Sequence, residues 1–347
     1  MKRSSYQKRL SSLREKLTGK DPDTVWILQP ENRRYLSGFR AYDPQINESS
    51  GSLLISRGKA ILITDSRYSI EAEREARDFE VITLKKDFIE EFPRLLTRLK
   101  TKVLGFEEDC LTWQLHRNLV KRFKELSSPV RLTPLNRIVD GMREVKDRSE
   151  IKAMEASADM ISKVMEEIIT GLKPGRTEIE IAREIERLSY EAGAEGMAFP
   201  SIVASGPNGA LPHAVPTNRK IRLKDPIIFD VGIKLGGYCS DMTRTIFLEP
   251  PGPIFRNIYR TVRAAQLSAL EAIRPGVDST GPDSVARKII KKAGFGDYFG
   301  HSLGHGVGMA THEAPRLGPK HPVKLEKGMV VTVEPGIYIP GRGGGPA

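Results

Sequence analysis

Two aspartates, Asp230 and Asp241, lie in the segment IIFDVGIKLGGYCSDMTRTIF, which has the pattern of two strands around a glycine turn. A turn centred between Leu235 and Gly236 would place the two carboxylates directly opposite each other on one face, about 5 Å apart. Like charges in that arrangement destabilise a hairpin unless a cation neutralises them, and hard oxygen ligands favour ions such as Mn²⁺. The alternative is one aspartate exposed in a turn and the other at a strand end. The hairpin alone leaves both interpretations open.

A second set of residues that could carry chemistry lies further along the chain. Three of the six histidines, His301, His305 and His312, lie in GHSLGHGVGMATHEAP, among glycines that let backbone and ligand approach closely. Glu334 ends the Val-rich run MVVTVE, which we expect to be a strand, and a buried carboxylate there is costly unless it is paired or bound to metal. The alternatives are ordinary core or surface histidines and a solvent-exposed strand end.

The elements that must position these residues alternate between strand-like and helical patterns. In the first part, strands are predicted over 24–30, 52–68, 79–84, 102–108 and 129–135, and helices over 88–100 and 111–126. This pattern predicts a compact α/β domain over residues 1–135, followed by a linker over 136–148. Residues 149–347 form the second domain, with helices starting near Ser149 and after Thr177, and further helices over 254–274 and 281–293.

Composition limits the class of protein. A length of 347 residues favours two domains, and no apolar run reaches the roughly 20 residues that cross a bilayer. The two cysteines, Cys110 and Cys239, show no pairing or zinc-binding pattern and are expected to be reduced thiols. We therefore expect a cytoplasmic protein that does not bind a membrane.

The net charge of +11 raises the question of a polyanionic partner. The first 20 residues hold seven Lys or Arg and apolar residues at helical spacing: Tyr6, Leu10, Leu13 and Leu17. A mitochondrial presequence and a polyanion-binding arm are two interpretations. No flexible spacer separates this helix from the first strand, and aromatic and basic residues are not interleaved elsewhere. We therefore favour the first helix of the domain, and no nucleic-acid binding.

Five segments in order carry a resemblance to a family: LPHAVP, FDVGIKLGGYCSDMTRT, GHSLGHGVG, THEAP and VVTVEPGIY. Together they resemble the pita-bread metallopeptidases (family M24), in the branch of the Xaa-Pro dipeptidases (prolidases) and Xaa-Pro aminopeptidases. RRYLSGF and LITDSRY resemble the creatinase/prolidase N-terminal domain. The resemblance covers nearly the whole chain. It implies an α/β N-terminal domain followed by an α+β pita-bread catalytic domain.

The resemblance also implies the roles of individual residues. The metal ligands would be Asp230, Asp241, His305 and Glu334, with Asp241 bridging two ions. The catalytic residues would be His213, His312 and Glu334, and the substrate-binding residues would be His213, His301, His312 and Tyr338. Two divalent cations, manganese or cobalt foremost and zinc or iron as alternatives, would lower the pKa of a bridging water so that it attacks the peptide bond before proline. The substrate would be an Xaa-Pro dipeptide or a proline-containing peptide, and the protein would be a homodimer.

The family pattern has a fifth ligand, a glutamate in a short strand soon after EPGIYIPG. Here the residues read GRGGGPA, and no glutamate follows Glu334. We therefore expect a catalytic domain truncated at its C-terminal end and lacking its last strands, at most one tightly bound metal, and impaired hydrolysis. A one-base frameshift would produce such an ending. The alternatives are an inactive relative that binds peptides or proteins, and a creatinase-like hydrolase without metal. The ligand carboxylates argue against the latter.

Overall fold

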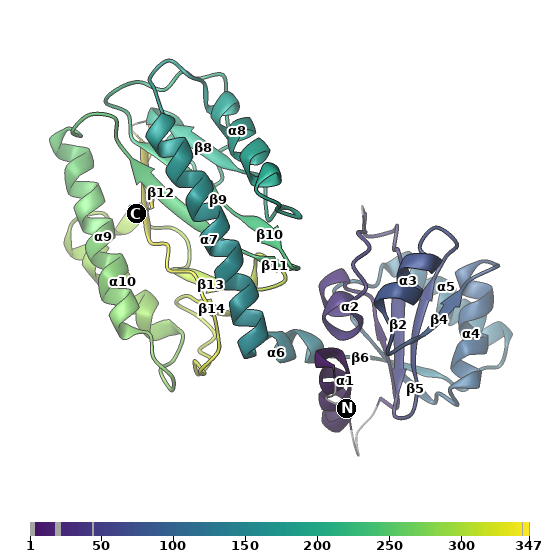
Figure 1. Cartoon of the computed structure of the whole chain (residues 1–347). Helices are drawn as coiled ribbons and strands as arrows, with labels where there is room; N and C mark the ends of the chain where they lie inside the picture. The colour runs from purple at the N-terminus through teal and green to yellow at the C-terminus, as the bar shows by residue number, and fades with distance from the viewer. Residues whose placement is uncertain (1–3, 18–21, 44, 342, 347) are drawn as a thin grey trace. The chain divides into compact units, whose positions relative to one another are not determined.

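The computed structural model describes residues 4–17, 22–43, 45–341 and 343–346 (Figure 1). The chain divides into two compact units, Met1–Met142 and Arg143–Ala347. This division falls inside the segment predicted as a linker, 136–148, and that segment contains a helix, α6 (Ile138–Glu144). No helix in the described part of the chain is both long and apolar enough to cross a membrane.

The first unit is built on a six-stranded sheet in the order β4-β3-β2-β1-β5-β6. Its strands are β1 (Thr24–Ile27), β2 (Ser52–Ser56), β3 (Ala60–Thr64), β4 (Glu80–Thr83), β5 (Val103–Phe106) and β6 (Arg131–Pro134). The central strand β1 pairs antiparallel with β2 and parallel with β5. Helices α4 (Phe88–Arg98) and α5 (Trp113–Glu125) pack on the sheet through a core that includes Trp26, Phe92 and Phe123. The strands and both helices lie where the sequence predicts them.

The basic N-terminal segment is the first helix of this unit. Helix α1 (Ser5–Leu17) buries Leu10, Leu13 and Leu17, so its apolar stripe faces inward and this interpretation is confirmed. Helices α2 (Pro30–Ser37) and α3 (Ser69–Glu75) are not predicted from the sequence. Both are two turns long or less, which is too short for their few apolar residues to show a helical period.

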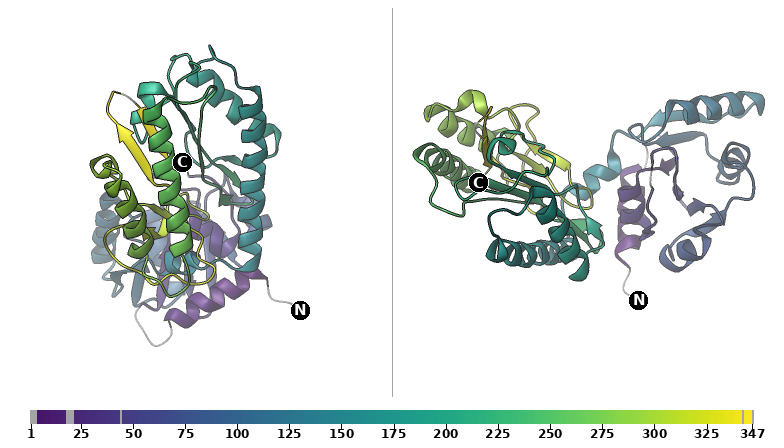
Figure 2. Two further views of the ribbon diagram at one scale, coloured as in Figure 1. Left: turned by 90° about the vertical axis from the view of Figure 1, so that its left-hand side faces the viewer. Right: turned by 90° about the horizontal axis from the view of Figure 1, so that it is seen from above.

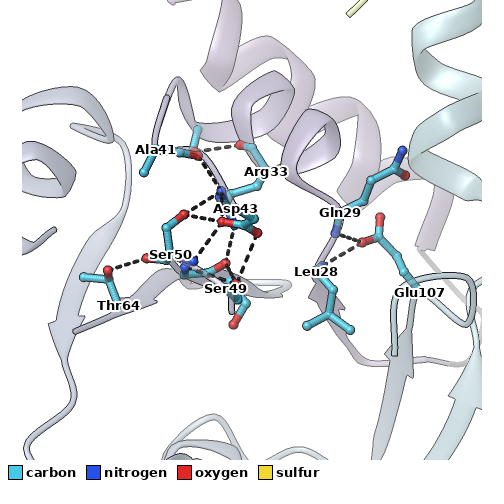
Figure 3. Close-up of polar contacts among 12 residues, drawn as sticks. Leu28, Gln29, Arg33, Ala41, Asp43, Ser49, Ser50, Thr64 and Glu107 are labelled. Carbon is cyan, nitrogen blue, oxygen red and sulfur yellow. Dashed lines mark hydrogen bonds and ion pairs between the residues drawn. The ribbon is translucent and has the colours of Figure 1, made fainter. Parts of the chain in front are cut away.

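Helix α2 carries a buried arginine that anchors the following loop (Figure 3). The Arg33 guanidinium donates to both carboxylate oxygens of Asp43, at 2.9 and 3.0 Å, and to the carbonyls of Ala41 and Gly51, at 2.8 and 2.6 Å. Burial raises the pKa of Asp43, but the hydrogen bonds and charge of Arg33 outweigh it and hold that pKa below its usual value. The loop is therefore held to α2 by a bidentate ion pair.

The second unit has two similar halves. Helices α7 (Arg148–Gly171) and α8 (Glu178–Glu191) share a core with β8 (Ile202–Ser205) and β9 (Ile227–Val231). Helices α9 (Pro253–Ala272) and α10 (Thr280–Lys292) share a second core with the later part of the chain. These two helices lie side by side, as Figure 1 and Figure 2 show. Each half therefore covers its strands with a helix pair.

The helix starts follow capping chemistry. Thr177 caps α8 as predicted, with its hydroxyl accepting from the Glu180 amide. Helix α7 begins at Arg148, close to the predicted start near Ser149, and its cap is Asp147. The Asp147 carboxylate accepts from the amides of Ser149 and Glu150, at 2.7 and 3.0 Å. A carboxylate also interacts favourably with the positive end of the helix dipole, which a serine hydroxyl does only weakly.

The remaining elements of this unit are short. They are β7 (Gly196–Met197), η1 (Gly206–Ala210), β10 (Ile233–Leu235), β11 (Tyr238–Cys239), β12 (Met242–Ile246), η2 (Gly296–Tyr298), β13 (Gly304–Gly306), β14 (Glu313–Leu317), β15 (Gly336–Ile339) and β16 (Gly343–Pro346). The Val-rich run before Glu334 is not a regular strand. It lies beside β13 through separate bonds, such as Thr332 N to His305 O at 2.8 Å and Glu334 N to Leu303 O at 2.9 Å.

The chain does form a strand after EPGIYIPG. Residues of β16 pair antiparallel with β15, with Ile337 opposite Gly345. A Cβ atom on Gly344 would lie 2.0 Å from the carbonyl oxygen of Ile337, so this close pairing requires glycine. The described residues therefore do not show the loss of strands that we expected from the sequence.

Candidate metal centre

The hairpin that carries the two aspartates forms with a different register from the predicted one. Asp230 lies opposite Thr243, and the turn consists of Gly236 and Gly237, with φ values of +59° and +84°. Two consecutive residues with positive φ are typical of the tight two-residue hairpin turn. The predicted pairing of Asp230 with Asp241 is therefore wrong by two residues. A shift of two preserves the alternation of side chains, so both aspartates still point to one face.

Asp241 faces a position without a side chain. The amide of Ser240 donates to Ile233 O at 2.9 Å, and continuing this register places Asp241 opposite Gly232. A Cβ atom on Gly232 would lie 2.1 Å from the carbonyl oxygen of Ser240, so only glycine fits there. The close approach leaves room beside Asp230 on the face that the two carboxylates share.

His305 brings the downstream residues to this face. Its Nε2 lies 3.1 Å from Glu334 Oε1 and 3.6 Å from Asp241 Oδ2, while its Nδ1 lies 3.0 Å from the carbonyl oxygen of Gly306. The Thr332 hydroxyl donates to the same Glu334 oxygen at 2.8 Å. The side chains of His305, Asp241 and Glu334 expose 16%, 11% and 29% of their surface, so water competes weakly for these contacts.

The electrostatics show an excess of buried negative charge. Burial raises the pKa of Asp230 to about 7, and the charges of Asp241 and Glu334 add to the effect. Burial and the charge of Glu334 raise the pKa of Asp241 to about 6. Burial lowers the pKa of His305, but its hydrogen bonds to Glu334 and to the Gly306 carbonyl, together with the charges of Glu334 and Asp241, outweigh this and raise it overall. Burial also raises the pKa of Glu334, but hydrogen bonds from His305 and Thr332 hold that pKa below its usual value. Three carboxylates, those of Asp230, Asp241 and Glu334, therefore have one imidazole, that of His305, to offset their charge.

These residues fit a divalent cation. Asp230 Oδ1 is buried and has no hydrogen-bond partner among the residues described, which is the state of an oxygen that lacks its ligand. Carboxylate oxygens with one imidazole nitrogen suit Mn²⁺, Co²⁺ and Zn²⁺. Across the described ranges, no three His, Cys, Asp or Glu side chains are arranged as they stand to enclose an ion. The candidate ligands instead contact one another, with His305 Nε2 close to both Glu334 and Asp241.

Two further histidines lie next to the carboxylates. The rings of His305 and His312 are 4.3 Å apart between centroids. Burial lowers the pKa of His312, and the positive charge of His305 and that of His213 lower it further. His213 lies in an exposed turn after η1.

His301 and Tyr338 lie against each other. Their ring centroids are 5.6 Å apart, and His301 Nδ1 lies 2.7 Å from Ser302 O. His301 Nε2 is buried without a hydrogen-bond partner in the described part of the chain. Burial raises the pKa of Tyr338, and the charges of Glu334 and Asp230 act in the same direction. Tyr338 is therefore close to the carboxylates.

A cavity of about 420 Å³ reaches two of the candidate ligands. Asp241 and Glu334 line it together with Ile151, Met154 and Gln266 from the helices. It differs from the predicted substrate surface, because its lining does not include the candidate substrate residues His213, His301, His312 and Tyr338.

The sequence did not reveal a buried ionic cluster next to His312. Glu313 pairs with Arg143 and with Lys146, whose Nζ lies 3.2 Å from Glu313 Oε2. These three side chains expose 6%, 3% and 1% of their surface. Charged residues are normally solvated, so the sequence gives no signal for their burial other than the position of Glu313 beside a candidate histidine.

Cys110 and Cys239 are both free thiols, as predicted.

Comparison with known proteins identifies the family. The model of metallopeptidase family M24 matches residues 152–345, and that of the creatinase/prolidase N-terminal domain matches residues 9–145. The Xaa-Pro dipeptidase of Pyrococcus furiosus is 35% identical over 339 residues, which cover 97% of this chain and 92% of that protein.

Solved structures agree in fold. The structure of an Xaa-Pro dipeptidase from Bacillus anthracis has a TM-score of 0.91 at 35% identity, covering 98% of this chain and 93% of the other. That of an X-Pro aminopeptidase from Thermotoga maritima has a TM-score of 0.85 at 35% identity, covering 96% and 93%. The chain therefore belongs to metallopeptidase family M24, with a creatinase/prolidase N-terminal domain preceding its pita-bread catalytic domain.

Proposed function

We propose that this metallo-exopeptidase cleaves the peptide bond before proline, either in Xaa-Pro dipeptides or at the N-terminus of longer peptides. The observation that carries the proposal is the cluster of His305, Glu334 and Asp241, together with the buried Asp230 Oδ1, which has no hydrogen-bond partner among the described residues. Its support is the 35% identity to a protein named as an Xaa-Pro dipeptidase over nearly the whole chain. A binding-module role would not need this donor set, and no observation favours it.

Asp230, Asp241, His305 and Glu334 would hold the divalent ions, manganese or cobalt foremost. When bound, such ions polarise the scissile carbonyl and lower the pKa of a water molecule. Glu334 is ionised at neutral pH because its pKa is held low, so it can accept a proton. His312 is neutral at that pH, and a neutral imidazole donates one hydrogen bond and accepts another. We assign it, with His213, to the substrate carbonyl, and assign His301 and Tyr338 to the substrate pocket.

The 347 residues contain four of the five ligands that the family resemblance implies. For a polypeptide of these residues we propose one tightly held ion, on Asp241, His305 and Glu334, and weak hydrolysis. Isothermal titration with Mn²⁺ tests this, with His305→Ala as the control that should lose the tight site. Two tight sites in the unchanged polypeptide would overturn the proposal of a single ion.

The activity is tested with Leu-Pro and a Leu-Pro-Xaa tripeptide in Mn²⁺ or Co²⁺. The assay compares the 347-residue polypeptide with a version carrying an appended closing strand that contains a glutamate. We expect the extended version to cleave faster. Cleavage of the dipeptide alone would identify a dipeptidase, and cleavage of the tripeptide an aminopeptidase. If neither version cleaves either peptide, the proposed function is wrong. Sedimentation of the same samples tests the homodimer that we propose from the family resemblance.

A further inference from the structure

The Glu313 side chain is buried, although the neighbouring residue His312 is exposed. Its Oε1 accepts from the Arg143 guanidinium and from the Ala310 amide, the latter at 3.0 Å, and its Oε2 lies 3.2 Å from Lys146 Nζ. The ring of His312, the residue before Glu313, lies 4.3 Å from the ring of His305 between centroids.

The Glu313 carboxylate also shapes the turn that carries His312. Its bond to the Ala310 amide closes the segment 310–313, and the amide of Gly308 donates to Ala310 O at 3.1 Å. A Cβ atom on Gly308 would lie 2.4 Å from Glu313 Oε2, so the backbone passes directly over the carboxylate. The Thr311 hydroxyl fixes the outer side of the turn by donating to Ala198 O at 3.0 Å.

We infer that Glu313 is a positioning residue that holds His312 against His305. The inference rests on the proposed function, because His312 is assigned there to the substrate carbonyl. Arg143 and Lys146 lie at the start of the catalytic unit, and both form ion pairs with the Glu313 carboxylate. The carboxylate then holds the 310–313 turn in place through its bond to the Ala310 amide. Replacing the Glu313 carboxylate by a neutral amide keeps the shape of the side chain but removes its ion pairs with Arg143 and Lys146.

The test measures the contact between His312 and His305 in the metal-free polypeptide. With ¹³C-labelled histidine, the six histidines of the chain give a small spectrum. We expect a nuclear Overhauser effect between the His305 and His312 rings, and its loss in Glu313→Gln. The matched control is Glu150→Gln. Glu150 is another buried carboxylate near Lys146 in sequence, and it accepts from the Tyr238 hydroxyl at 2.8 Å. The control should keep the effect between the two rings.

Retention of the ring contact in Glu313→Gln, or its equal loss in the Glu150→Gln control, would overturn the inference. If Glu313→Gln does not fold, the double variant Glu313→Gln/Lys146→Met, which also removes one stranded cation, is measured instead. In the extended polypeptide we expect Glu313→Gln to lower kcat up to about 100-fold with KM little changed, as for a misplaced catalytic group. The ring contact decides the inference without activity, so it can succeed or fail independently of the proposed function.

Discussion

Replacing Asp230 by asparagine should stabilise the metal-free chain, and the gain should grow with pH. The pKa of Asp230 is raised from 3.8 to about 7 in the folded chain. The folded state therefore holds this proton more tightly than the unfolded state, and the free energy of unfolding falls as the pH rises through this range. At about 1.4 kcal/mol per pKa unit, this shift lowers the free energy of unfolding by about 2 kcal/mol at pH 5, where the folded carboxyl group still holds its proton, and by about 4 kcal/mol at pH 8, where it is ionised. Asparagine has no charge to bury.

Urea unfolding in EDTA at both pH values measures this difference. Both tryptophans of the chain, Trp26 and Trp113, lie in the first unit, so their fluorescence follows that unit and serves as an internal control. Circular dichroism follows both units. The gain of Asp230→Asn at pH 8 should exceed the gain at pH 5 by about 2 kcal/mol, in the second unit alone. Added Mn²⁺ should stabilise the unchanged chain more than the variant. A gain that does not depend on pH would refute the reasoning.

Three other predictions concern single residues. His305→Ala should remove the stabilisation by Mn²⁺, since the proposed site then loses its one imidazole ligand; thermal melting with and without Mn²⁺ checks this, and an unchanged metal response would exclude His305 as a ligand. Gly232→Ala should destabilise the second unit by about 1–3 kcal/mol, because its Cβ would collide with Ser240 O; urea unfolding followed by circular dichroism measures it. Asp43→Asn should lower the stability of the first unit by about 3–5 kcal/mol, because Arg33 is left buried without a counter-charge; tryptophan fluorescence measures it, and a loss well under 1 kcal/mol would contradict this account.

The aspartate hairpin shows how far sequence reasoning reaches. The alternation of apolar and polar residues places Asp230 and Asp241 on one face in any register that shifts by an even number. Which residue lies opposite which depends on the turn, and two adjacent glycines allow more than one centre. The structure places Gly236 and Gly237 both in the turn. Local chemistry therefore predicted the face, while the register depended on backbone angles that the residue types permit but do not dictate.

Buried charges were the main part that the sequence could not predict. Arg33, Glu313 and Lys146 look like solvated surface residues in the sequence, and only the folded chain brings their partners to them. Short helices such as α2 were not predicted for a different reason: their few apolar residues do not show a helical period. The candidate ligands Asp230, Asp241, His305 and Glu334 were named through the family resemblance, and their role as ligands stays a prediction.

We expect local opening of the fold at the glycine strand β16. Its three glycines bring no side chains to the core, and glycine loses more conformational entropy on folding than any other residue. Local opening of β16 would expose the amides of β15 to solvent, so their hydrogen exchange should be faster than that of the β9 amides. A Cβ on Gly343 would lie 2.4 Å from the Gly206 carbonyl oxygen, so β16 lies directly on η1, the turn that precedes His213. Each opening would therefore loosen the loop that carries His213.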